Sequence, residues 1–426
     1  MTNTFKTNRR SLLQGAAAGG LLAASPLVSR FASAQSSAPI KIGFQQHSTG
    51  IGAAYGRWYG RTTEAAVKLI NDGGGINGRP VEIIAEDDGT DPKRGAEVVE
   101  KFANQYNCDV AFGTLFSHVV YGSAPAAGEQ KLPYFVVSEG HHVASGALNR
   151  YTLQPGITDV KSQVQAMAPY VTKNLGKKVT MIFPDFAFGH DHRDYFTAAI
   201  EAQGGEVLEH IAIPPTETSF TKYFPKIPRD TEVLYHVMVG PAVLTFVKEL
   251  GEFFGPSSPA IFGFIDSLEA VDLASPGLEF LEGTYFWEGN PRYAQPDQTS
   301  HDKIFRAAVG VDNNGASVSD PKDVSTYAHM FGCWETLYVI KAGMEAAGYQ
   351  GPEDRAKLIE AVEAMTDMPE SDEHPQGPKR FNGKTHQVFG VQYISRVENG
   401  RLVKVHTTSI EDTLYPDEVD YTTMSF

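Results

Sequence analysis

Short apolar runs alternate with amphipathic segments along the chain from residue 39 onward. Runs typical of buried strands cover residues 40–44, 81–86, 110–113 and 134–137. Between them, apolar side chains recur at helical spacing over residues 56–71 and 92–106. Continuous apolar strands separated by amphipathic helices are typical of a parallel sheet covered on both faces. The pattern therefore predicts an α/β lobe.

The same alternation then starts again. Helices are predicted over residues 159–175, 189–203 and 241–253, and strands over residues 179–183, 207–213, 232–237 and 260–264. Two α/β units of similar size follow one another, so we expect two lobes.

The rest of the chain is too short for a third domain. Helices are predicted over residues 300–309, 325–347 and 352–365. A hairpin is predicted from residues 388–395 and 401–408, turning at Glu398-Asn399-Gly400. We expect these elements to complete the two lobes.

The first 34 residues have the pattern of an export signal. They carry four basic residues and no acid, an apolar stretch over residues 15–28, and Ala32-Ser33-Ala34 as a cleavage site. The pair Arg9-Arg10 resembles the twin-arginine type, although a plain secretory signal can also carry two arginines. A membrane anchor would need about 20 strongly apolar residues. We therefore expect cleavage near Ala34 and no stable membrane insertion afterwards.

Charge excludes a nucleic-acid partner. The formal net charge of −15 becomes −19 once the four basic residues of the signal are removed, whereas a nucleic-acid binder needs a basic surface. Cys108 and Cys333 are the two cysteines. An oxidising compartment permits a disulfide between them, but a domain of this size does not need one, so their pairing stays open.

A glycine-rich stretch after the first strand imitates a nucleotide motif. Gly50 and Gly52 match the first and third glycines of the dinucleotide fingerprint, but Tyr55 stands at the sixth position and the glycine follows at Gly56. A tyrosine there would block the approach of a pyrophosphate, so no nucleotide cofactor is expected. What remains is a polar loop, residues 46–50, at the strand end where open α/β sheets bind ligands.

No catalytic or metal motif accompanies this loop. The sequence has no Gly-x-Ser-x-Gly, Walker loop, zincin helix or kinase set. Five histidines fall on predicted loops at strand ends, but their spacing is not that of a recognised metal site: His118, His141, His142, His190 and His192. We expect a binding protein without cofactor or metal; an exported hydrolase of another layout is the alternative.

Several motifs resemble one family. They are Ala54-Tyr55-Gly56, then residues 70–79 (INDGGGINGR), Glu86-Asp87-Asp88 with Asp91-Pro92, Phe188-Gly189, and Pro214-Pro215-Thr216. From residue 39 to the C-terminus the chain resembles the periplasmic binding proteins for leucine, isoleucine and valine, the type I solute-binding family of ABC importers. The glycines of residues 73–78 are mainly turn residues that identify the fold.

The resemblance implies a periplasmic protein with two Rossmann-like lobes, joined by a three-strand hinge and closing around one solute. The lobes would comprise residues 39–157 plus 289–380 and residues 158–288 plus 381–426. The partners would be a small-molecule solute and an ABC permease with its ATPase subunits. A ligand-sensing subunit would share all of these features.

The same resemblance implies a set of solute-binding residues. They lie on loops at strand ends in both lobes: Ser48, Thr49, Tyr55, Phe116, Ser117, Ser138, Gly140, His142, Phe188 and Asp266. Ser117 would bind a carboxylate, Phe188 would stack on the solute, and Asp266 would meet an α-ammonium group.

The loop Ser138-Glu139-Gly140-His141-His142 departs from the family, which usually carries small residues and threonine there. Aromatic residues also crowd the expected cleft: Phe116, Tyr121, Phe186, Phe188, Phe264, Tyr285 and Trp287. An amino acid or related small organic acid is the first expectation, and an aromatic carboxylate or small amide the second.

Overall fold

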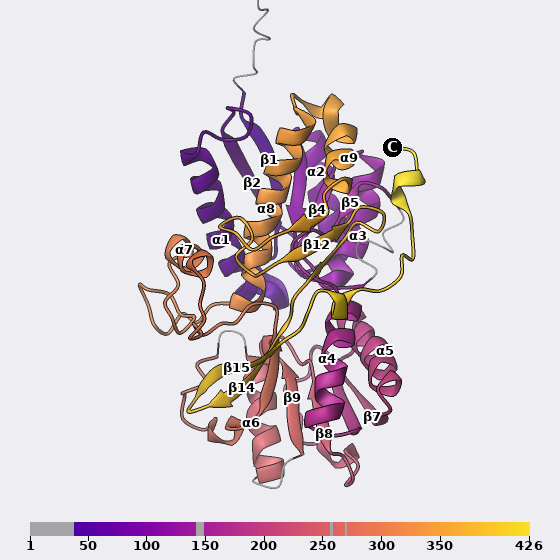
Figure 1. Cartoon of the computed structure of the whole chain (residues 1–426), viewed down its shortest axis with the longest axis vertical. Coiled ribbons are helices and arrows are strands. Elements are labelled where there is room, and N and C mark those ends of the chain that lie inside the picture. Colours follow the sequence, from indigo (N-terminus) through magenta and orange to yellow (C-terminus); the bar gives the residue numbers. More distant parts are fainter. Residues whose placement is uncertain (1–37, 142–148, 256–258, 269–270) are drawn as a thin grey trace, which may run out of the picture. The chain divides into compact units, whose positions relative to one another are not determined.

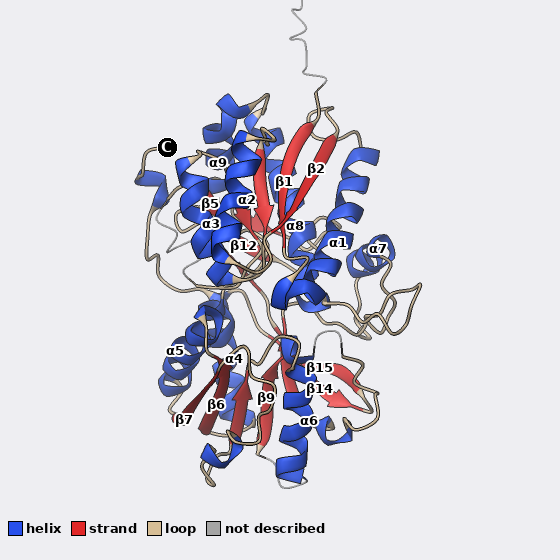
Figure 2. Ribbon diagram, turned by 180° about the vertical axis from the view of Figure 1, so that it is seen from behind, coloured by secondary structure: helices blue, strands red, loops and turns tan. Residues whose placement is uncertain are grey.

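The computed structural model describes residues 38–141, 149–255, 259–268 and 271–426. The expected export signal and His142 therefore lie outside the described residues. Figures 1 and 2 show the arrangement of helices and strands from two opposite sides.

The first sheet is parallel throughout and has the strand order β2-β1-β3-β4-β5. Its strands are β1 (Ile40–Gln46), β2 (Val81–Asp87), β3 (Val110–Gly113), β4 (Tyr134–Val136) and β5 (Thr152–Leu153). Its helices are α1 (Ala53–Asp72), α2 (Pro92–Asn104) and α3 (Ser117–Glu129). The predicted elements of this lobe are confirmed, and α3 and β5 are additions.

Alternate residues of each strand feed two separate cores. Phe44 and Phe112 pack with α1 on one face, whereas Ala111 and Tyr134 pack with α2 and α3 on the other. Both faces of the sheet are therefore covered by helices, as the continuous apolar strands predicted.

The second sheet has the order β15-β14-β10-β9-β8-β6-β7. Its parallel strands are β6 (Lys178–Pro184), β7 (Glu206–Ile213), β8 (Val233–His236), β9 (Ala260–Phe264) and β10 (Tyr285–Glu288). Two antiparallel strands, β14 (Tyr393–Glu398) and β15 (Arg401–Thr407), extend it at one edge. Its helices are α4 (Val160–Asn174), α5 (Ala187–Ala202) and α6 (Val243–Phe254). Two α/β lobes are therefore present, as expected.

The remaining elements mostly extend the first lobe. They are α7 (Ser300–Val309), α8 (Tyr327–Ala347), α9 (Arg355–Glu363) and a small antiparallel sheet of β11 (Asp367–Met368), β12 (Lys379–Asn382) and β13 (Gln387–Gly390). Phe381 and Val388 belong to the core of the first sheet. Residues 381–390 thus pack with the first lobe, whereas the sequence assigned everything from residue 381 to the second.

The predicted hairpin is partly wrong. Its turn is as expected, because Asn399 and Gly400 both have positive φ, 54° and 69°. Its first strand is two strands, since residues 387–390 pair with β12 and residues 393–398 pair with β15. The chain passes from one lobe to the other at residues 391–392, which the apolar pattern does not mark.

Three connections join the lobes, between β5 and α4, between β10 and α7, and between β13 and β14. Two side chains, which we call the hinge clamp, bond to all three. The Gln376 side-chain amide donates to the carbonyls of Gly289 (2.5 Å) and Val391 (2.7 Å), and the Lys379 ammonium donates to the carbonyl of Gly156. The three connections are therefore held at one place.

Residues 408–426, here called the C-terminal strap, make a further passage that the sequence did not predict. After β15 the chain packs against α4 through the 3-10 turn η7 (Glu411–Thr413). It then returns to the first lobe, where the Tyr421 N–H donates to the Lys384 carbonyl (2.8 Å) and the Phe426 ring lies 5.9 Å from the Tyr151 ring. Figure 1 shows this segment in yellow, running from one lobe to the other.

Three further points of the sequence analysis can be checked in the described residues. Gly74, Gly75, Asn77 and Gly78 all have positive φ, so these residues form the predicted turn. In the described part of the chain both cysteines are buried, free thiols. None of the described helices combines the length and the apolar character needed to cross a membrane.

Candidate functional site

A small cavity lies where loops at the strand ends of the two lobes face each other. The first lobe contributes residues from α1 and from the loops after β3 and β4, and the second lobe contributes residues from the loops after β6 and β8. Six of the lining residues carry apolar or aromatic side chains and two are polar: Tyr55, Leu115, Phe116, Ser117, Glu139, Phe186, Phe188 and Val239. The cavity is thus mostly apolar, with a few polar groups placed in it.

Four of the predicted site residues line this cavity: Tyr55, Phe116, Ser117 and Phe188. Ser138 lies directly behind them, because its hydroxyl oxygen is 3.2 Å from that of Ser117. Its carbonyl accepts a hydrogen bond from the Gln154 side chain (2.6 Å). Gly140 is buried in the same loop.

Ser48 and Thr49 do not line the cavity. Both are exposed, and both backbone N–H groups donate to Asp87 Oδ1, at 2.8 and 3.1 Å. The Thr49 hydroxyl donates to the other oxygen of the same carboxylate (2.7 Å). Asp87 therefore accepts the hydrogen bonds of Ser48 and Thr49, two residues that the resemblance assigned to solute binding. Asp266 belongs to the 3-10 turn η4 (Ile265–Leu268), and its side chain lies outside the described part of the structure.

Two helices begin at the cavity, one in each lobe. α3 begins at Ser117 and α5 begins at Ala187. Their N-cap residues, Phe116 and Phe186, have extended backbones and no side-chain cap. The first N–H groups of both helices are consequently left for another acceptor, and their positive helix ends favour an anion.

Glu139 is an acid in this otherwise apolar setting, and it is only 3% exposed. Its Oε1 accepts hydrogen bonds from His329 Nε2 on α8 (2.9 Å) and from the Gln163 side chain on α4 (3.0 Å). Sequence reasoning noted Glu139 as unusual but did not include it among the site residues. The sequence signal that could have identified Glu139 was an acidic residue in a loop where the family usually carries small, neutral residues.

An aromatic wall supports Phe188 from behind. Phe264 lies 5.7 Å from the Phe188 ring and stacks on Trp287 at 3.9 Å. The His192 ring lies 4.6 Å from Phe188, and a hydrogen bond joins its Nδ1 to the Tyr235 hydroxyl (2.8 Å). Burial lowers the pKa of His192 to about 3, so this imidazole is neutral at neutral pH.

Two of the histidines that follow β6, His190 and His192, make structural contacts. His190 pairs with Asp185 at 2.8 Å on the surface, while His192 is buried in the aromatic core. Among the described residues, no three His, Cys, Asp or Glu side chains lie close enough together to hold a metal ion.

The shifted glycine of the nucleotide-like motif has a packing explanation. A Cβ atom at Gly56 would lie 2.2 Å from the carbonyl oxygen of His47. Gly56 thus allows α1 to approach the end of β1 closely, and the preceding residue, Tyr55, lines the cavity.

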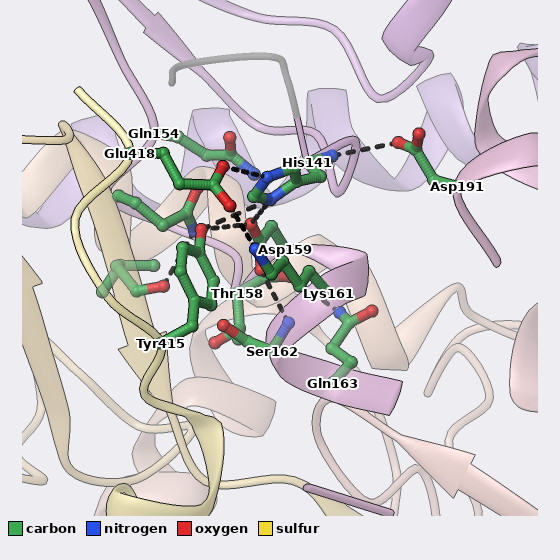
Figure 3. Close-up of polar contacts among 12 residues, drawn as sticks. His141, Gln154, Thr158, Asp159, Lys161, Ser162, Gln163, Asp191, Tyr415 and Glu418 are labelled. Atoms are coloured by element: carbon green, nitrogen blue, oxygen red, sulfur yellow. Dashed lines mark hydrogen bonds and ion pairs between the residues drawn. The ribbon is translucent and has the colours of Figure 1, made fainter. Parts of the chain in front are cut away.

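A charged network, which we call the latch, joins the lobes beside the cavity (Figure 3). His141, in the loop after β4, bonds through Nδ1 to Asp159 (2.7 Å) and through Nε2 to Glu418 of the C-terminal strap (2.6 Å). Its backbone N–H donates to Asp191 on α5 (3.0 Å), and Glu418 also pairs with Lys161 on α4.

Both ring nitrogens of His141 face carboxylates, so both must donate. Burial opposes the charged ring, but the hydrogen bonds and charges of Asp159 and Glu418 outweigh it and raise the pKa of His141. Burial also raises the pKa of Asp191 to about 6, against the effect of His141. The latch therefore fastens the strap and both lobes through one histidine side chain.

Comparison with known proteins identifies the family. The family model described as periplasmic binding protein matches residues 39–401. The Leu/Ile/Val-binding protein BraC3 of Rhizobium johnstonii is 24% identical over 335 residues, which cover 78% of this chain and 85% of that protein.

Two solved structures show the same fold. A solute binding protein of an ABC transporter from Rhodopseudomonas palustris, in complex with p-hydroxybenzoic acid, has a TM-score of 0.75 at 21% identity, covering 89% of this chain and 98% of that one. The branched-chain amino acid transporter substrate binding protein LivJ from Streptococcus pneumoniae, in complex with isoleucine, has a TM-score of 0.66 at 18% identity, covering 86% and 99%. The chain therefore belongs to the periplasmic binding proteins, as a type I member of the leucine/isoleucine/valine-binding family.

Proposed function

We propose that the protein is the periplasmic solute-binding subunit of an ABC importer and binds an amino acid or related small organic acid between its lobes. The observation that carries this proposal is the cavity whose walls come from both lobes. A solute there would contact Ser117 in one lobe and Phe188 in the other only when the lobes are closed. Binding would thus favour the closed form that a permease recognises.

The chemistry of the cavity favours a carboxylate with an apolar body. The Ser117 hydroxyl and the first N–H groups of α3 and α5 would bind the carboxylate. Phe116, Phe186 and Phe188 would surround the apolar part.

An aromatic carboxylate is the second candidate, and a small amide is related to it. The number of aromatic side chains at the cavity favours a flat solute. Solute binding proteins of similar fold from Rhodopseudomonas palustris hold 4-hydroxybenzoate and benzoate, while the LivJ protein holds isoleucine. The shared fold accommodates both classes, so the choice depends on the side chains in the cavity.

A thermal-shift screen of the exported chain tests the proposal with amino acids, aromatic carboxylates and amides. A true ligand at about 100 times its dissociation constant should add about 2.7 kcal/mol to the free energy of unfolding. Ser117→Ala should weaken binding and leave the unliganded melting temperature nearly unchanged. Turnover of a screened compound would instead support an exported hydrolase, and binding without uptake through a permease would support a sensing subunit.

A further inference from the structure

Only one of the two carboxylate oxygens of Glu139 accepts hydrogen bonds from the described residues. Its Oε1 accepts two hydrogen bonds, from His329 and Gln163. Oε2 accepts no hydrogen bond from a described residue, and it is not enclosed by the protein but is reached from the cavity that the side chain lines. A donor group of a solute in the cavity would therefore meet an oxygen that the protein leaves available, and hydrogen bonds to charged groups are among the stronger ones.

We infer that Glu139 is the specificity-determining residue of this site and that its Oε2 accepts a hydrogen bond from an ammonium group of the solute. The inference rests on the proposed function. It assigns the acid to the first lobe, in the loop after β4, whereas the sequence resemblance pointed to Asp266 in the second.

The position of Glu139 also decides where the solute carries its ammonium group. Ser138, the preceding residue, lies with its hydroxyl 3.2 Å from that of Ser117. The carboxylate site at Ser117 and the acid at Glu139 therefore belong to adjoining loops on neighbouring strands β3 and β4. Ser117 and Glu139 also line the same small cavity, which favours a solute that carries its carboxylate and its ammonium group on one carbon, as an α-amino acid does.

The contacts of Glu139 connect solute recognition to lobe closure. Gln163 belongs to α4 of the second lobe, and its side chain also donates to the carbonyl of Thr158 (2.8 Å) in the first connection. His329 holds the same Oε1 from α8, which packs with the first lobe. The ammonium group of the solute would thus donate to Oε2 of a carboxylate whose other oxygen, Oε1, is already held by residues of both lobes.

Matched pairs of compounds test this inference by calorimetric titration. The pairs are leucine with 4-methylpentanoate and phenylalanine with 3-phenylpropanoate, which differ only in the amino group. The wild-type protein should bind the amino acid of a pair about 10 to 100 times more tightly, as for a hydrogen bond between charged groups. Glu139→Gln should remove that preference while binding the acid without the amino group as the wild type does.

Ser117→Ala serves as the matched control. It should weaken both members of a pair by the same factor, because both carry the carboxylate. The unliganded melting temperature of each variant reports folding, and equal binding of both members of a pair by the wild type would overturn the inference without any variant.

The possible failures are distinguishable. If the wild type binds both members of a pair equally, or if Glu139→Gln keeps the preference, the inference about Glu139 is wrong and the proposed function stands. If the wild type binds only screened compounds that lack an amino group, the inference is wrong and the proposed function stands; if it binds none of the screened compounds, both fall.

Discussion

Replacing Lys379 by methionine should strongly destabilise the protein. Lys379 is 1% exposed, and its ammonium pairs with the carboxylate of Glu335, which is fully buried on α8. Burial opposes ionisation of Glu335, but the charges of Lys379 and His374 outweigh it and hold its pKa below the usual range. Without Lys379 the carboxylate would stay buried with no neighbouring ammonium, and the Gly156 carbonyl would lose its donor.

The expected loss is about 3–5 kcal/mol, the cost of removing one partner of a buried ion pair. Removing both charges, as in Lys379→Met with Glu335→Leu, should restore part of it, because no uncompensated charge then remains. The recovery would be incomplete, since the backbone N–H of Gln376 donates to Glu335 Oε1 (3.0 Å) and would lose its acceptor, at about 1–3 kcal/mol.

Urea unfolding followed by tryptophan fluorescence measures both variants, because Trp58, Trp287 and Trp334 are all buried. With a slope of about 3 kcal/mol per molar urea, the single variant should unfold roughly 1 to 1.7 M earlier than the wild type. A single variant within 1 kcal/mol of the wild type would refute the reasoning. So would a double variant as unstable as the single one.

Two further predictions concern stability. His47, His192 and His236 are buried, and burial lowers the pKa of each to about 3. Their neutral forms stabilise the fold above pH 6.5, and this stability is lost as pH falls from 6.5 towards 3. Protonation of each histidine should lower the free energy of unfolding by about 3 kcal/mol at pH 4.5. The urea midpoint should therefore be lower at pH 4.5 than at pH 7.5, and an unchanged midpoint would contradict this prediction. Gly56→Ala should cost about 1–3 kcal/mol, because its Cβ would lie 2.2 Å from the His47 carbonyl; a melting temperature equal to the wild type would show that α1 can shift freely.

Local patterns were sufficient for most of the fold. The alternation of apolar runs and amphipathic segments predicted both sheets and most of their helices. It missed α3, because residues 117–129 are mostly small or apolar, contain Pro125, and lie against the sheet without a clear polar face. It missed β10 (Tyr285–Glu288), whose short apolar run ends in an acid, Glu288, that is buried in the structure.

The site was predictable only in part. The resemblance to the leucine/isoleucine/valine-binding family pointed to Tyr55, Ser117 and Phe188, and the structure has all three at the cavity. It could not separate them from Ser48, whose partner Asp87 lies 39 residues further along the chain. Such long-range partners are set by tertiary packing, which the local pattern of one sequence does not report.

The C-terminal strap bears on how long a bound solute would stay in place. Glu418 reaches His141 at one lobe and Lys161 at the other, so separating the lobes would require the strap to release at least one of them. Release of a bound solute would then require two events, the separation of the lobes and the detachment of the C-terminal strap. The strap would thus lower the dissociation rate of the solute without making any contact with it.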